Sequence, residues 1–310
     1  RGREALDHHP PSPIGTPMTF VTRFAPSPTG YLHLGHAFSA LTAFRTAQDE
    51  GGRFLLRIED IDRTRCRPEF EAAIYEDLAW LGLRWDEPVR RQSERLADYA
   101  AALDRLVAIG VVYRCFKTRK EVLDDIARAP HLSVDGPEGP AYVGAPLAMH
   151  EERSLIAAGA PYAWRLSMTA ARNHLGAAFD QLSFTVEDGE PRRIKATPEI
   201  FGDIIIARKD LGTSYHLASV HDDALQGVTH VIRGEDLAAA AHLHRLLQAL
   251  LDYPEVIYRH HRLITDEAGK KFSKRDASVT LRSLRDSDVS AADLCSALSL
   301  RGGAVLKAAQ

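Results

Sequence analysis

The chain has 310 residues, 26% of them charged and 45% hydrophobic, and a formal net charge of −3. This length predicts about two domains with an ample core. No run approaches the roughly 18 apolar residues of a membrane span, so we expect no membrane segment. The negative net charge excludes a protein coated in positive charge, and a nucleic-acid partner would need a local basic surface. The three cysteines, Cys66, Cys115 and Cys295, are far apart and odd in number, which argues against a disulfide framework and favours the cytoplasm.

The first 17 residues contain four prolines, two adjacent histidines and no hydrophobic pattern. They are typical of a disordered leader or an extension, and they lack the apolar segment of a signal peptide. Met18, directly before the first apolar run, is a plausible start.

The first half of the chain alternates strand and helix signals. Apolar runs predict strands at residues 19–24 and 53–58, each followed by a helix, at about 37–48 and 68–81. Ser93 is a candidate cap for a further helix that ends at Gly110.

The texture changes at about residue 111. A strand at 111–116 precedes a capping box, Thr118 to Glu121, which opens a helix to Arg128. Residues 129–146 are rich in proline and glycine and show no periodicity. We interpret residues 111–182 as an insertion between two halves of a parallel sheet.

The sheet is expected to resume with a strand at 203–208. A helical region around Asp222 and Asp223, a strand at 228–232 and a helix at about 237–251 continue the pattern. A short strand follows Pro254, and residues 280–300 look helical. The fold class predicted is α/β. The predicted units are 1–17, 18–110, 111–182, 183–258 and 259–310.

The first predicted strand leads into a turn of sequence PSPTGYLHLGH, residues 26–36. Backbone N–H groups and the positive end of a helix dipole point at such a turn, where anionic ligands bind. Gly35 permits close approach of a ligand, and His33 and His36 offer donors for anionic oxygens. The alternative is that the prolines and glycines only build a turn, with His36 a plain helix N-terminal residue.

A second feature is the cationic segment Lys271-Phe272-Ser273-Lys274-Arg275. Positioned lysines stabilise charge that develops on a transferring phosphate and on pyrophosphate. Taken alone, the segment is equally typical of a solvated loop.

Together the two motifs resemble those of class I aminoacyl-tRNA synthetases. HLGH is similar to the HIGH signature of that class, and KFSKR to its KMSKS loop, with Phe272 for Met and Arg275 for the final Ser. Three further segments resemble glutamyl-tRNA synthetases: RFAPSPTG at 23–30, RIEDID at 57–62 and VIRGED at 231–236. The resemblance covers about residues 18–276 and implies a Rossmann-type catalytic domain.

The resemblance also implies the site. His33, His36, Lys271 and Lys274 would stabilise the phosphates of ATP, with Gly35 also at the nucleotide. Glu59 would take the ammonium of glutamate. The remaining expected glutamate contacts are Arg23, Ala25, Ser27, Tyr215 and Arg233. The alternative for the two arginines is structural pairing with Glu235 and Asp236. Mg²⁺ would arrive with ATP, because no carboxylate cluster dictates a protein-held site.

Only about 35 residues follow Arg275, and no anticodon-binding domain is expected there. In this the chain resembles the glutamyl-queuosine tRNA(Asp) synthetases. That resemblance implies a monomer that activates L-glutamate without tRNA and transfers it to queuosine in the anticodon stem-loop of tRNA(Asp). The alternatives are a truncated glutamyl-tRNA synthetase charging the 3′ end of tRNA(Glu), an adenylyltransferase without tRNA, and a silent RNA-binding paralogue.

The chain departs from these relatives at a zinc site that many carry in the insertion. Cys115 stands at the first ligand position and Tyr142 at the third, but Lys117 and Pro146 replace the two other thiolates. A tetrahedral site cannot be built from one thiolate and a tyrosine, so we predict no zinc unless His131 or His150 substitutes. A second departure is His221, which precedes the paired aspartates where an apolar residue is usual.

Contacts to tRNA phosphates need local basic clusters. The candidates are Arg63, Arg65 and Arg67, and Arg192, Arg193 and Lys195. Each cluster could equally be a solvated charged face.

Overall fold

A computed structural model describes residues 19–128, 135–264 and 279–299. The leader at 1–17, His131 and the whole KFSKR motif, with Lys271 and Lys274, lie outside these residues. No helix within the described ranges is long and apolar enough to cross a membrane.

The first half forms a parallel three-stranded sheet in the order β1-β2-β3. Strands β1 (Val21–Phe24) and β2 (Arg53–Ile58) and helices α1 (Leu34–Asp49) and α2 (Pro68–Trp80) confirm the prediction. Strand β3 (Asp86–Arg91) was not predicted, because DEPVRR lacks the apolar alternation that marks a strand. It lies at the edge of its sheet, where Pro88 is tolerated.

The prediction that Ser93 caps the next helix is wrong. A short 3-10 turn (Gln92–Glu94) comes first, and α3 (Leu96–Ala108) begins after Arg95. The backbone N–H and hydroxyl of Ser93 instead donate to Asp60, at 2.8 and 2.5 Å. Ser93 therefore ties the end of β3 to the segment that follows β2.

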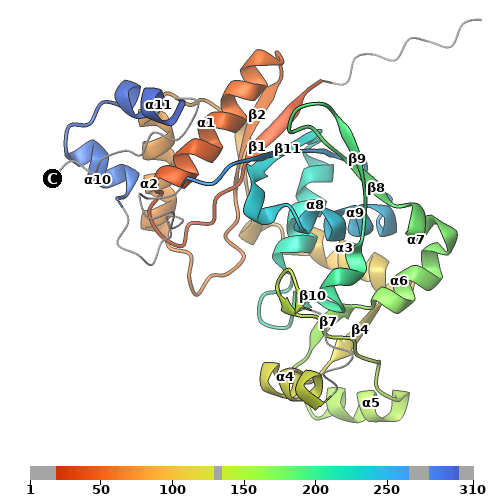
Figure 1. Ribbon diagram of the computed structural model, residues 1–310. Helices are drawn as coiled ribbons and strands as arrows, with labels where there is room; N and C mark the ends of the chain where they lie inside the picture. The colour runs from red at the N-terminus through yellow and green to blue at the C-terminus, as the bar shows by residue number, and fades with distance from the viewer. Residues whose placement is uncertain (1–18, 129–134, 265–278, 300–310) are drawn as a thin grey trace, which may run out of the picture.

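The second half contains a four-stranded sheet in the order β11-β12-β8-β9. Its strands are β8 (Ser183–Val186), β9 (Arg192–Lys195), β11 (His230–Gly234) and β12 (Ile257–His261). Helices α8 (Tyr215–Leu225) and α9 (Ala240–Leu250) pack together beside it, with 3-10 turns at Pro198–Phe201 and Glu235–Leu237 (Figure 1). Thr229 donates its N–H to the carbonyl of Val21 at 2.9 Å, so β1 and β11 run side by side and join the two halves.

The insertion has its own sheet, in the order β10-β7-β4. Strands β4 (Val112–Cys115) and β10 (Ile204–Arg208) both pair antiparallel with β7 (Ala163–Leu166). The prediction that residues 203–208 resume the parallel sheet is therefore wrong. A short apolar run suits a parallel or an antiparallel partner equally, and the sequence carries no signal that separates them.

The capping box of the insertion is confirmed. Thr118 and Glu121 exchange hydrogen bonds at the start of α4 (Arg119–Arg128). The other elements are a hairpin of β5 (Asp135–Gly136) and β6 (Gly139–Pro140), and helices α5 (Met149–Ala157), α6 (Met168–Leu175) and α7 (Ala177–Gln181). Helices α4 and α5 lie at the end of the molecule farthest from α1 (Figure 1).

The helical region predicted at 280–300 consists of two helices, α10 (Leu281–Asp286) and α11 (Ala291–Ser299). Leu281, Leu294 and Leu298 are buried in one core cluster with residues of α1 and α2. The N–H of Leu281 donates to the carbonyl of Leu32 at 2.8 Å, so α10 begins beside the start of α1.

Candidate active site

A cavity of about 500 Å³ opens where β1, β2 and β11 end. The carboxyl ends of parallel strands are where open α/β sheets bind ligands. All six residues expected to contact glutamate line this cavity, and so does His36: Arg23, Ala25, Ser27, Glu59, Tyr215 and Arg233. His33 and Gly35 lie one step back, at the start of α1. Their individual roles stay predictions.

The histidines do two things at once. Nδ1 of His33 accepts the N–H of Gly35 at 3.1 Å, and Nδ1 of His36 accepts the N–H of His33 at 3.2 Å. Both rings thus cap α1, as the plain alternative held. An Nδ1 that accepts leaves the ring proton of a neutral imidazole on Nε2.

Gly35 has a steric reason in addition to the expected one. A Cβ at this position would lie 3.1 Å from Cε1 and 3.2 Å from Nδ1 of His33. The ring of His33 would have to shift by a few tenths of an ångström, and the same ring accepts the backbone N–H of Gly35. Gly35 therefore protects the cap that orients His33.

Arg23 is paired, but its partner is neither of the predicted acids. Its Nε lies 2.9 Å from Oδ1 of Asp223 on α8, and both side chains are buried. The alternative that Arg23 pairs with Glu235 or Asp236 is wrong for this arginine. Asp223 fixes Arg23 at the cavity wall from behind.

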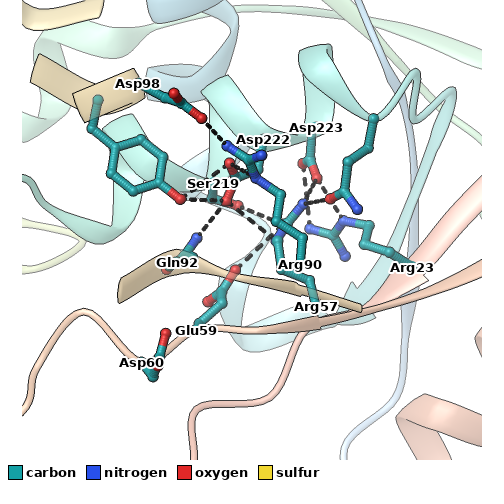
Figure 2. A network of polar contacts seen from close by, with 12 residues as sticks. Arg23, Arg57, Glu59, Asp60, Arg90, Gln92, Asp98, Ser219, Asp222 and Asp223 are labelled. Atoms are coloured by element: carbon teal, nitrogen blue, oxygen red, sulfur yellow. Dashed lines mark hydrogen bonds and ion pairs between the residues drawn. The ribbon is translucent and has the colours of Figure 1, made fainter. Parts of the chain in front are cut away.

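Arg57 lies at the centre of this buried network and was missed from the sequence (Figure 2). It is fully buried, and its Nη1 donates to Asp223 at 2.8 Å and to Gln226 at 3.0 Å. Its Nη2 donates to Oε1 of Glu59 at 3.3 Å. A charged residue inside an apolar strand run was the available signal, because a buried arginine requires acidic partners.

Asp222 closes the network on the other side. It accepts from Nε of Arg90 at 2.6 Å, from Gln92 at 2.9 Å and from the hydroxyl of Tyr99 at 2.9 Å (Figure 2). His221, the residue before Asp222 at which the chain departs from its relatives, forms a hydrogen bond between its Nδ1 and the hydroxyl of Tyr253 at 2.7 Å. It is accommodated as a partly buried polar residue of α8.

The network shifts two carboxylates in opposite directions. Burial raises the pKa of Glu59, against the opposing influence of Arg57 and Arg23. Burial also disfavours ionised Asp223, but Arg23 and Arg57 prevail and hold its pKa below the ordinary value. The ionised form of Asp223 is therefore stabilised in the folded protein. The ionised form of Glu59 would be stabilised by a further cation.

Arg233 stands apart from this balance. It is buried, and its Nη1 lies 3.5 Å from the hydroxyl of Tyr215. Its Nε and Nη2 are buried with no hydrogen-bond partner among the described residues, and the ring of Tyr258 lies 5.1 Å from its guanidinium. The alternative, an ion pair of Arg233 with Glu235 or Asp236, is not seen among the described residues. A guanidinium in this position can accept a carboxylate from a ligand.

Comparison with known proteins settles the family. The catalytic-domain model "tRNA synthetases class I (E and Q)" matches residues 19–310. The "Glutamyl-Q tRNA(Asp) synthetase" of Rhodobacter capsulatus is 46% identical over 88% of this chain and 98% of its own length. The chain belongs to the glutamyl-Q tRNA(Asp) synthetases.

More distant relatives place this family within the class I ligases. The "Glutamate--tRNA ligase 2" of a Ruegeria species is 38% identical over 91% of the chain, which spans only 61% of that ligase. The crystal structure of glutamate-tRNA synthetase from Elizabethkingia anophelis matches with a TM-score of 0.68 and 30% identity, over 83% of this chain and 53% of that one. The Rossmann-type catalytic fold and the use of ATP, both predicted, follow from this membership.

The donor set does not suit the zinc site that the resemblance in the sequence implies. Cys115 is a buried free thiol on β4, and Lys117, two residues on, forms an ion pair with Asp125. A cation at this position repels a metal ion. Among the described residues, no group of three His, Cys, Asp or Glu side chains could hold a metal. The prediction that this protein lacks zinc stays a prediction.

The basic clusters expected to contact tRNA differ in availability. Arg65 lines the cavity, Arg67 pairs with Glu69, and Arg193 pairs with Glu255. Arg192 and Lys195 are exposed on β9. Their contact with tRNA stays a prediction.

Proposed function

We propose that this protein activates L-glutamate with ATP and transfers the glutamyl group to queuosine in the anticodon of tRNA(Asp). The observation that carries the amino-acid part is the buried Arg233. The three arginines of the network, Arg23, Arg57 and Arg90, each pair with acids from the set Glu59, Asp98, Asp222 and Asp223. Arg233, by contrast, has no acidic partner among the described residues, and a carboxylate of glutamate would neutralise it.

Glu59 supplies the opposite charge at the same cavity. The N–H of Glu59 donates to the carbonyl of Pro26 at 3.1 Å, which holds the end of β2 against the turn that carries Ser27. The raised pKa of this carboxyl means that a nearby ammonium group would favour its ionised form. A cavity with one such acid and one buried guanidinium that lacks an acidic partner among the described residues suits an α-amino acid with an acidic side chain.

The reaction we propose has two steps. The α-carboxylate oxygen of glutamate attacks the α-phosphorus of ATP, the bond to the bridging oxygen breaks, and pyrophosphate leaves. The Nε2–H donors of His33 and His36, at the N-terminus of α1, would stabilise charge on the phosphates. A queuosine hydroxyl then attacks the acyl carbon of the adenylate, and AMP leaves.

Lys271 and Lys274 are proposed to join the histidines in the first step. Thr280, six residues after Lys274 in the chain, forms a β-bridge with His33. Mg²⁺ would enter with ATP, since the described part of the chain offers no carboxylate cluster for it.

The acceptor is assigned from the relatives. The chain covers nearly all of the R. capsulatus protein, at 46% identity, but only 60–61% of three glutamate–tRNA ligases, at 37–38%. We therefore favour queuosine over the 3′ end of tRNA(Glu) as the acceptor. Glutamate-dependent exchange of pyrophosphate into ATP, measured without tRNA, tests the first step. Its absence would contradict the proposed activation of glutamate.

A further inference from the structure

A chain of three polar side chains joins the insertion to the back of the cavity. Oε1 of Glu138, between β5 and β6, lies 2.7 Å from Nε2 of His216 on α8. Nδ1 of His216 lies 3.1 Å from Nε2 of His244 on α9. The two imidazoles are 5% and 2% exposed, whereas half of the Glu138 side chain is exposed.

The hydrogen bond to Glu138 places one ring proton of His216. An ionised carboxylate only accepts, so His216 directs its Nε2–H at Glu138. The bond to His216 in turn holds the pKa of Glu138 below its ordinary value. Burial, together with the charge of Arg233, lowers the pKa of His244 and favours its neutral form. The bond between Nδ1 of His216 and Nε2 of His244 carries one ring proton, whose side is set by the tautomers.

These two rings hold Tyr215. The ring centroid of Tyr215 lies 5.2 Å from that of His216 and 5.7 Å from that of His244. Tyr215 lines the cavity and meets Arg233 through its hydroxyl. A shift of either histidine would therefore move the only hydrogen-bond partner that Arg233 has among the described residues.

The hairpin is held in place independently of Glu138. A Cβ on Gly136 would lie 2.5 Å from the carbonyl oxygen of Ile200, so the hairpin backbone packs directly on the 3-10 turn Pro198–Phe201. Phe201 in that turn contacts His216 edge to face, with centroids 6.2 Å apart. The hairpin is thus packed beside α8, and from this position Glu138 reaches His216.

We propose that Glu138 is a positioning residue for the glutamate site: from the insertion hairpin it fixes His216 and His244, and these rings hold Tyr215 against Arg233. This inference rests on the proposed function, because it assumes that the cavity binds glutamate. Glu138 itself touches no substrate. Its effect is on the affinity for the amino acid and not on the phosphates of ATP, which would lie at the start of α1.

The test is pyrophosphate exchange with glutamate and ATP varied separately. Glu138→Ala is expected to raise the KM for glutamate about five- to tenfold while KM for ATP and kcat stay within about twofold. Glu138→Gln, whose amide oxygen still accepts from His216, is expected to stay within about twofold of wild type. Glu138→Asp withdraws the carboxylate by one methylene and is expected to give about a threefold rise.

Glu152→Ala is the matched control, because Glu152 pairs with Arg114 inside the insertion and does not reach α8. An unchanged KM for glutamate in Glu138→Ala, an equal rise in KM for ATP, or an equal effect of Glu152→Ala would overturn the proposal. If wild type itself shows no glutamate-dependent exchange, the proposed function fails first. If wild type shows exchange and Glu138→Ala leaves the KM for glutamate unchanged, only the positioning role of Glu138 is rejected.

Discussion

Nη1 of Arg233 lies 3.5 Å from the hydroxyl of Tyr215, and this is the only hydrogen bond that the described residues offer to this buried guanidinium. The nearby Arg57 is also buried, but it pairs with the carboxylates of Glu59, Asp222 and Asp223. Of these two buried arginines, Arg57 has acidic partners, whereas Arg233 has none among the described residues. This contrast predicts opposite effects of their removal on stability.

Arg233→Gln is expected to lower kcat/KM for glutamate in pyrophosphate exchange at least 100-fold, a loss of about 2.7 kcal/mol or more in transition-state stabilisation. The same change should leave the free energy of unfolding unchanged or raise it by about 1 kcal/mol, because an unpaired buried charge is removed. Urea unfolding measures the second effect. A large loss of stability would show that Arg233 is a structural ion-pair residue.

Arg57→Gln is expected to reduce the free energy of unfolding by about 3 kcal/mol or more. The substitution leaves Glu59 and Asp223 buried without their central cation, which is costly. Equilibrium urea unfolding at pH 7 measures the loss. A change below about 1 kcal/mol would mean that the network is redundant.

Asp223→Asn is expected to destabilise the protein in a pH-dependent way. The pKa of Asp223 is lowered in the folded state by Arg23 and Arg57, so its contribution is present above the unfolded pKa of about 3.8 and is lost as pH falls through the lower folded value. The stability difference between wild type and variant should therefore be full at pH 6–7 and shrink toward pH 3. A difference that grows on acidification would contradict this assignment.

The contribution of Asp77 to the free energy of unfolding is expected to have the opposite pH dependence. Its side chain is fully buried, and burial raises its pKa to about 6 despite Arg285 at 3.3 Å. The folded state then holds the proton more tightly than the unfolded one, so stability from this group falls as pH rises from about 4 to about 6. Asp77→Asn should abolish that decline and raise stability at pH 7 by about 1–2 kcal/mol.

Urea unfolding of both proteins from pH 4 to 8 measures the effect. Glu76→Gln on the same helix is the control, because Glu76 is 61% exposed and also meets Arg285. Parallel curves for wild type and Asp77→Asn would refute the raised pKa.

His33 allows the cap to be separated from the chemistry. Asn is a good N-cap, so His33→Asn should keep the free energy of unfolding within about 0.5 kcal/mol, whereas His33→Ala should cost about 1 kcal/mol. Both should lower pyrophosphate exchange at least tenfold, because both remove the Nε2–H donor. Wild-type exchange in His33→Asn would reduce this histidine to a cap.

Lys274→Ala is expected to lower exchange at least tenfold, or about 1.4 kcal/mol of transition-state stabilisation. Lys270→Ala, just before the motif, serves as the control and should have a smaller effect. An unchanged rate in Lys274→Ala would remove this lysine from the proposed mechanism.

The sequence was sufficient to place the residues that follow strand ends. Arg23, Glu59 and Arg233 lie at or beside the carboxyl ends of β1, β2 and β11, and parallel strands bring such ends together at one edge. The apolar runs of β1 and β2 were readable because both strands are buried on both faces.

The partners behind the cavity could not be predicted. Asp223 lies 200 residues from Arg23 and 166 from Arg57 along the chain, and no local pattern links them. The strand at 204–208 was assigned to the wrong sheet because its pairing depends on β7, which the sequence signals weakly. Both failures concern long-range pairing, which a local pattern does not encode.

The central claim is that queuosine in tRNA(Asp) accepts the glutamyl group, and glutamate labelling of tRNA tests this claim most directly. Purified enzyme, ATP and labelled glutamate are incubated with tRNA(Asp) that carries queuosine, with tRNA(Asp) that lacks it, and with tRNA(Glu). We expect label on queuosine-containing tRNA(Asp) alone, recovered in the anticodon fragment after nuclease digestion. Equal labelling of both forms of tRNA(Asp), or labelling of tRNA(Glu) alone, would contradict it.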